Sequence, residues 1–126
     1  MAIDTALDES MVDNVQSMSL PKNNTDYGKK TYWDHRFSTE LEYEWLVSWE
    51  DVAYLLKPFL SPSGRILVVG CGNSSFSADL YDAGYKNVCS VDYSDVVINA
   101  MRSRNQEQRP DMEWMVCACL ISFVEM

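Results

Sequence analysis

Two short segments of the chain have the residue types and the spacing of a ligand-binding site. The loop Gly70-Cys71-Gly72-Asn73-Ser74-Ser75 follows an apolar run, and Asp92 closes a second apolar run about twenty residues later. Glycines let a backbone approach a ligand closely, and a following helix directs its free N–H groups toward that ligand. An acidic residue at this distance can accept hydrogen bonds from the hydroxyls of a ribose. The pattern predicts a nucleoside cofactor bound by Gly70, Gly72 and Asp92.

Two other interpretations of this loop remain open. Gly70 and Gly72 would form a strand-to-helix turn in any case, and Asp92 would then only cap the next helix. We favour the cofactor site because loop, helix and carboxylate occur together in the order that the fold requires. A nicotinamide-dependent oxidoreductase is less favoured, because dinucleotide loops have a third glycine where this chain has Ser75.

The elements around the loop predict an α/β fold of the Rossmann-like type. Residues 66–69 form a continuous apolar run, which is typical of a strand buried on both faces of a parallel sheet. Residues 87–92 and 112–117 predict further strands, and residues 120–124 are a further apolar stretch. The order is that of a right-handed β-α-β-α unit. Asp92 is expected at the exposed carboxyl end of its strand, where open α/β sheets bind ligands.

Three amphipathic helices are expected beside these strands. One begins with a capping box from Ser48 to Asp51, and one ends at Gly84. The last is capped by Ser94. Their expected inward faces are Val52, Leu55, Leu56 and Phe59 in the first helix, Phe76, Leu80 and Ala83 in the second, and Val97, Ile98 and Met101 in the third.

The composition of the chain indicates how its domain is organised and which kinds of partner it can bind. Residues 1–27 are polar and acidic, which predicts a disordered tail, and residues 28–126 then form a partial domain. The net charge of -9 argues against binding to a nucleic-acid backbone. The four cysteines lack the spacing of a metal site, and no secretory signal or membrane-spanning run is visible. We expect a cytoplasmic protein with no metal, no membrane and no nucleic acid as partner.

Three segments resemble one enzyme family. Residues 32–37 (YWDHRF), 66–74 (ILVVGCGNS) and 90–94 (SVDYS) with Val96 and Val97 are similar to the elongation-factor-1-alpha lysine methyltransferases and their methyltransferase-like relatives. The resemblance implies a class I methyltransferase fold, S-adenosylmethionine as cofactor and a protein lysine as methyl acceptor. It assigns cofactor contacts to Trp33, Phe37, Trp45, Gly70, Asp92 and Tyr93, with Tyr93 against the adenine.

Some roles stay open within this resemblance. Trp33, Phe37 and Trp45 would pack equally well in a core without a ligand. His35 is expected to be a solvated helix residue, and no catalytic residue is assigned, because methyl transfer depends mainly on holding the reacting atoms in line.

The chain departs from the family after the third expected strand. Ala118 stands where the family has an Asp that accepts a hydrogen bond from the adenine amino group, and from about Val116 the residues no longer follow the family. We therefore expect a Rossmann-like methyltransferase fold that is truncated after about the third strand. The alternative function is a non-catalytic fragment that binds the cofactor or a partner.

Overall fold

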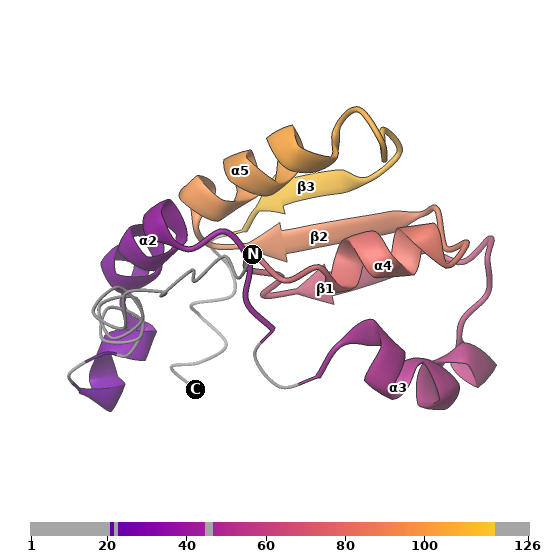
Figure 1. Cartoon of the computed structure of the whole chain (residues 1–126), viewed down its shortest axis with the longest axis horizontal. Coiled ribbons are helices and arrows are strands. Elements are labelled where there is room, and N and C mark those ends of the chain that lie inside the picture. The colour runs from indigo at the N-terminus through magenta and orange to yellow at the C-terminus, as the bar shows by residue number, and fades with distance from the viewer. Residues whose placement is uncertain (1–20, 22, 45–46, 118–126) are drawn as a thin grey trace, which may run out of the picture.

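The computed structural model describes residues 21, 23–44 and 47–117, and three parallel strands form its sheet (Figure 1). The strands are β1 (Ile66–Val69), β2 (Val88–Asp92) and β3 (Glu113–Val116), in the order β1-β2-β3. Val68 pairs with Ser90, which pairs with Trp114. Because all three strands are parallel, their carboxyl ends lie at one edge of the sheet.

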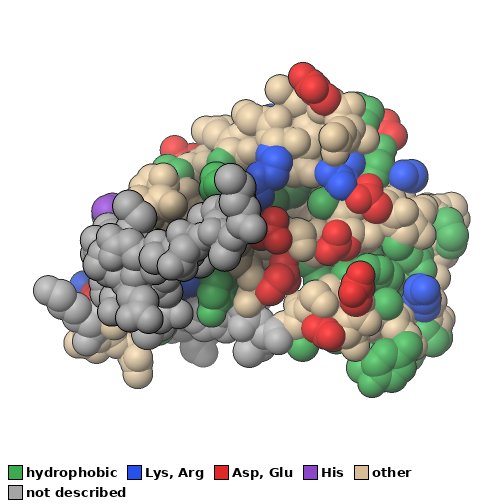
Figure 2. Space-filling view, viewed as in Figure 1, with side chains coloured by type: hydrophobic (Ala, Val, Ile, Leu, Met, Phe, Trp, Pro, Cys, Tyr) green, Lys and Arg blue, Asp and Glu red, His purple; other side chains and the backbone are tan. Residues whose placement is uncertain are grey.

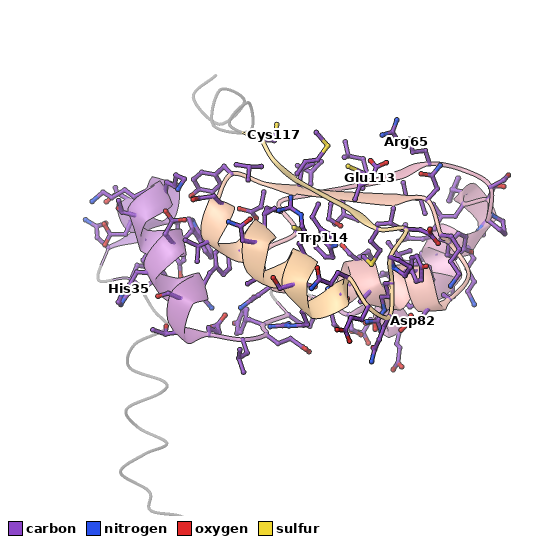
Figure 3. The ribbon with its side chains drawn as sticks, turned by 90° about the horizontal axis from the view of Figure 1, so that it is seen from above. His35, Arg65, Asp82, Glu113, Trp114 and Cys117 are labelled. Atoms are coloured by element: carbon purple, nitrogen blue, oxygen red, sulfur yellow. The ribbon has the colours of Figure 1, made fainter. Side chains whose placement is uncertain are left out.

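Helices α4 (Phe76–Asp82) and α5 (Asp95–Asn105) connect these strands and lie on the same side of the sheet (Figure 3). Their apolar faces meet the side chains that β1, β2 and β3 direct toward them. The core here contains Leu80, Val88, Ile98, Met101 and Trp114, all buried. The predicted α/β fold with a parallel sheet is confirmed.

The expectation that β1 is buried on both faces is wrong. Ile66 and Val68 pack against the core, whereas Leu67 and Val69 are 60% and 56% exposed. Side chains alternate along a strand, and α4 and α5 cover only one face. Within the described residues no helix covers the other face, where Val69 is in register with Val91 and Met115. A continuous apolar run therefore does not by itself reveal which layers are present.

The predicted ends of α4 and α5 are confirmed. Gly84 has a φ of +110°, and the N–H groups of Gly84 and Tyr85 bond to the carbonyls of Tyr81 and Leu80. This is a Schellman motif, in which glycine takes the left-handed position. Ala83, expected on the buried face of α4, is exposed.

Ser94 caps α5 as expected. Its hydroxyl accepts a hydrogen bond from the amide of Val97. Val97, Ile98 and Met101 are all 1% exposed or less, which confirms the inward face predicted for this helix.

The capping box at α3 (Trp49–Leu56) is also confirmed, but its predicted buried face is only partly right. Asp51 and Ser48 exchange the two hydrogen bonds of the box. The core packs against Ala53 and Leu56, whereas Leu55 is 53% exposed. Phe59 lies in the short helix η2 (Lys57–Phe59) and is 86% exposed, because the change to a tighter helix rotates it away from the core. Figure 2 shows apolar side chains on the surface near α3.

The tail boundary predicted at Tyr27 falls inside a structured turn. Helix η1 (Asn24–Gly28) precedes α2 (Lys30–Thr39), and the ring of Tyr27 packs edge-on against Tyr32. The indole N–H of Trp33 donates to the carbonyl of Tyr27 at 2.7 Å. Residues 1–20, which form most of the predicted tail, lie outside the described residues.

Candidate functional site

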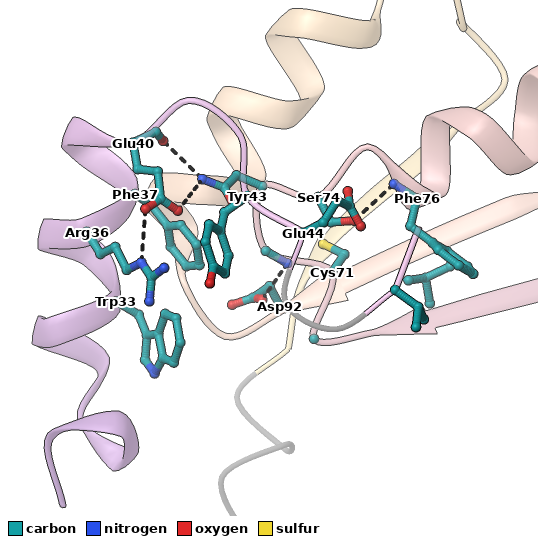
Figure 4. Close-up of a pocket in the computed structure, with 15 residues that line it drawn as sticks. Trp33, Arg36, Phe37, Glu40, Tyr43, Glu44, Cys71, Ser74, Phe76 and Asp92 are labelled. Atoms are coloured by element: carbon teal, nitrogen blue, oxygen red, sulfur yellow. Dashed lines mark hydrogen bonds and ion pairs between the residues drawn. The ribbon is translucent and has the colours of Figure 1, made fainter. Parts of the chain in front are cut away.

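A cavity of about 410 Å³ opens at the carboxyl ends of β1 and β2 (Figure 4). Its floor is the glycine loop with Asp92, and its wall is α2 with residues 40–44 and Val47, which follow it. The lining residues are Trp33, Arg36, Phe37, Glu40, Tyr43, Glu44, Val47, Val68, Gly70, Cys71, Gly72, Asn73, Ser74, Phe76 and Asp92. This is the edge at which open parallel sheets bind their ligands.

The glycine loop has the backbone conformation that its sequence predicts. Gly70 and Gly72 have φ angles of +66° and +50°, which residues with a Cβ rarely adopt. A Cβ on Gly72 would lie 3.4 Å from Cζ of Phe37, whereas a Cβ on Gly70 would meet no protein atom within 4 Å. A Cβ on Gly72 would thus be in ordinary contact with Phe37, and the positive φ is what favours glycine there, whereas Gly70 leaves its side of the cavity open to a ligand.

Asp92 holds the loop in place as well as lining the cavity. One carboxylate oxygen accepts a hydrogen bond from the amide of Gly72, and the other accepts one from the amide of Ser94, both at 3.0 Å. The residue is 5% exposed, and this burial raises the pKa of its carboxyl, although the hydrogen bonds from Ser94 and Gly72 act in the opposite direction. Asp92 lies at the carboxyl end of β2 as expected, but it is buried and its two hydrogen bonds connect the loop to the start of α5. Each carboxylate oxygen of Asp92 keeps a further lone pair that can accept a hydrogen bond from a hydroxyl group.

The aromatic residues of α2 form one wall of the cavity. Trp33 and Phe37 are stacked, with ring centroids 5.6 Å apart and planes 27° apart. Trp45 lies outside the described residues, and Tyr93 is half-buried and is not among the residues that line the cavity. The structure thus brings together Trp33, Phe37, Gly70, Gly72 and Asp92, and the contact of Tyr93 with adenine stays a prediction.

The sequence reasoning missed a set of charged residues in the same wall. Arg36 is 4% exposed, pairs with Glu40 at 3.2 Å and lies 4.7 Å from the ring centroid of Tyr43. Glu40 in turn accepts hydrogen bonds from the Asn73 amide through its backbone and side-chain oxygens. The four-residue spacing of Arg36 and Glu40 is a readable signal for a helical ion pair. No local pattern indicates the contact with Asn73.

Glu44 makes the second connection between this wall and the loop. Its Oε1 accepts hydrogen bonds from the Ser74 hydroxyl and the Ser75 amide, both at 2.7 Å, and from the Ser75 hydroxyl at 3.2 Å. Figure 4 shows Glu44 beside Ser74. The partners lie about thirty residues apart in the chain, so only the folded structure reveals them.

Helix α2 is also anchored to the start of α5. Lys30 bridges Asp34 and Asp95 at 2.6 and 2.7 Å, and the Ser94 hydroxyl donates to Asp34. The two carboxylates raise the pKa of Lys30, which stays protonated. His35 is exposed and does not line the cavity.

The described part of the chain offers little support for a reactive cysteine, a metal site or a membrane-spanning helix. Cys71 lines the cavity, but burial and then the charge of Asp92 raise the pKa of its thiol to about 12, so it is protonated and a poor nucleophile. Among the residues that the structure describes, no group of three His, Cys, Asp or Glu could hold a metal ion. No helix in this part is long and apolar enough to cross a bilayer.

The parallel sheet, the glycine loop and the carboxylate at the end of β2 together define a class of protein. The family described as a methyltransferase domain matches residues 67–123, which include both the loop and Asp92. Residues 67–123 are therefore similar to a methyltransferase domain, a class of protein whose cofactor is S-adenosylmethionine.

Within that class the chain is similar to the eEF1A lysine methyltransferases. It is 42% identical over 103 residues to EEF1A lysine methyltransferase 4 of Mus musculus, covering 79% of this chain and 40% of that protein. It is 40% identical over 104 residues to the Bos taurus protein of the same name, covering 80% and 40%. It is 36% identical over 98 residues to the eEF1A lysine and N-terminal methyltransferase of Mus musculus, covering 76% and 14%. The chain spans less than half the length of each relative.

Proposed function

We propose that this chain is the cofactor-binding part of an S-adenosylmethionine-dependent protein lysine methyltransferase. The observation that carries the proposal is the cavity in which Gly70 and Asp92 face the aromatic wall of Trp33 and Phe37. The names of the relatives, which specify eEF1A and lysine, support a lysine side chain of a protein as the methyl acceptor. The matches to methyltransferases favour this function over a non-catalytic fragment.

The residues of the cavity have separate tasks in this function. S-adenosylmethionine supplies an activated methyl group on a positively charged sulfur. Asp92, already fixed by two backbone amides, accepts hydrogen bonds from the ribose hydroxyls. Gly70 keeps its part of the cavity free of a side chain. The faces of Trp33 and Phe37 exclude water and are compatible with a cation.

Holding the cofactor in one orientation is the main catalytic contribution expected of these residues. The rate of methyl transfer depends on the alignment of nucleophile, methyl carbon and sulfur, so positioning alone supplies much of the rate enhancement. The anchoring of α2 to α5 through Lys30 and Asp34 keeps the aromatic wall at a fixed place relative to Asp92.

The test is the affinity of the chain for S-adenosylhomocysteine, measured by calorimetry on the parent and on Asp92→Asn. We expect the variant to bind about ten- to a hundredfold more weakly, because charge-assisted hydrogen bonds contribute about 1.5–3 kcal/mol. Glu107→Gln is the control, since it removes one negative charge from an exposed residue that does not line the cavity.

Both variants are measured below their unfolding transitions, because the amide at position 92 also weakens the contact with Gly72 or Ser94. A parent chain that does not bind S-adenosylhomocysteine, or equal binding by Asp92→Asn and Glu107→Gln, would overturn the proposed site.

A further inference from the structure

The glycine loop offers its polar hydrogens to a side chain of the protein itself. The Ser74 hydroxyl, the Ser75 amide and the Ser75 hydroxyl all donate to one oxygen of Glu44. In dinucleotide-binding folds the corresponding loop donors meet the phosphates of the ligand. In this chain the carboxylate of Glu44, from residues 40–44, has taken that role.

In the described part of the chain no lysine or arginine forms an ion pair with Glu44. Glu40, the other acid that lines this wall, pairs with Arg36. Glu44 is half-buried and lines the cavity together with Asp92. A ligand phosphate in this cavity would therefore meet two carboxylates and few free donors.

We infer that Glu44 is a specificity-determining residue that makes the cavity reject adenosine ligands with a phosphate at the 5′ carbon. This inference rests on the proposed function and deepens it, because it concerns the group attached to the 5′ carbon of the bound adenosine. Phosphate is repelled there, whereas a sulfonium or thioether is accepted. Exclusion by a like charge is a recognised route to specificity.

The hydrogen bonds of Glu44 to Ser74 and Ser75 also stabilise the loop, so the experiment must separate this structural role from the effect of the negative charge. Glu44→Gln keeps an oxygen that can accept from Ser74 and Ser75 but removes the negative charge. Glu44→Asp keeps the charge and shortens the side chain. Glu42→Gln removes a charge from an exposed residue of the same segment and is the matched control.

The experiment is calorimetric titration of the parent and the three variants with S-adenosylhomocysteine and with adenosine diphosphate. The two ligands share adenosine and differ in the group on the 5′ carbon. We expect Glu44→Gln to bind adenosine diphosphate at least about tenfold more tightly than the parent, equivalent to about 1.4 kcal/mol. The ratio of its affinity for adenosine diphosphate to its affinity for S-adenosylhomocysteine should rise by at least about tenfold. Glu44→Asp should keep the preference of the parent, and Glu42→Gln should too, because exposed charges are screened.

Unchanged affinity of Glu44→Gln for adenosine diphosphate would overturn the inference, and so would an equal gain in Glu42→Gln. If the parent fails to bind S-adenosylhomocysteine, the proposed function fails, while the comparison with adenosine diphosphate still decides the role of Glu44.

Discussion

At the scale of a single residue, a comparison of Gly70 with Gly84 separates the effect of a side chain on cofactor binding from its effect on backbone strain. Both have positive φ angles, and an added Cβ would meet no atom within 4 Å at either position, but only Gly70 lines the cavity. Alanine at each position should lower the free energy of unfolding by about 1–2 kcal/mol. Only Gly70→Ala should also weaken S-adenosylhomocysteine binding, by at least about tenfold.

Urea denaturation and calorimetry on both variants would check this. Equal affinities of Gly70→Ala and Gly84→Ala would mean that the ligand does not approach the loop at Gly70.

The sequence reveals those site residues whose roles follow from local spacing. Gly70, Gly72 and Asp92 were predictable because the loop and the end of the next strand are adjacent in any parallel α/β unit. Glu40 and Glu44 were not, because their contacts depend on where residues 40–44 lie against the loop. The burial of Asp92 was missed because the amides of Gly72 and Ser94 converge on it only in the folded chain.

At the scale of an element, Ser94 should matter more than an ordinary helix cap. Its hydroxyl accepts from Val97 and donates to Asp34, so it stabilises α5 and also holds α2. Ser94→Ala should lower the free energy of unfolding by about 1–2 kcal/mol. Ser103→Ala, an exposed change on the same helix, should have little effect in the same chemical denaturation experiment. Similar losses in both variants would show that neither hydrogen bond of the Ser94 hydroxyl stabilises the fold.

The capping box of α3 predicts a specific pH dependence. Hydrogen bonds from the backbone and side chain of Ser48 hold the pKa of Asp51 below its ordinary value of 3.8. The ionised carboxylate therefore stabilises the fold above that value, and this stabilisation is lost as the pH falls through the lower folded pKa. Asp51→Asn should melt a few degrees below the parent at neutral pH, and the two melting curves should converge in strong acid. A difference that stays constant with pH would contradict this role.

Helix ends were predictable from sequence, whereas buried faces were less so. Ser48, Gly84 and Ser94 act through neighbours within a few residues, so their roles can be deduced locally. The exposure of Leu67 depends on which face of the sheet the helices cover, and that of Phe59 depends on the change from α3 to a tighter helix. Neither is determined by nearby residues alone.

For the whole molecule, two deletions test where the folded part begins. Removing residues 1–20 should leave the melting temperature nearly unchanged, because their composition lacks apolar periodicity. Removing residues 1–28 should lower it by several degrees, because Trp33 then loses the carbonyl of Tyr27 and the ring beside it. Thermal denaturation of the two shortened chains would measure the difference. Equal melting temperatures would support the boundary at Tyr27 that the composition predicts.

The place of Trp33 in the cavity wall gives the chain an internal optical reporter. Trp49 and Trp114 are each 6% exposed in the core, whereas Trp33 faces the space that a ligand would fill. A ligand in the cavity therefore changes the surroundings of the Trp33 indole and leaves those of Trp49 and Trp114 unchanged. Ligand binding should quench part of the intrinsic fluorescence, and Trp33→Phe should remove that part while keeping an aromatic ring beside Phe37. The cofactor site can then be titrated without any label attached to the protein.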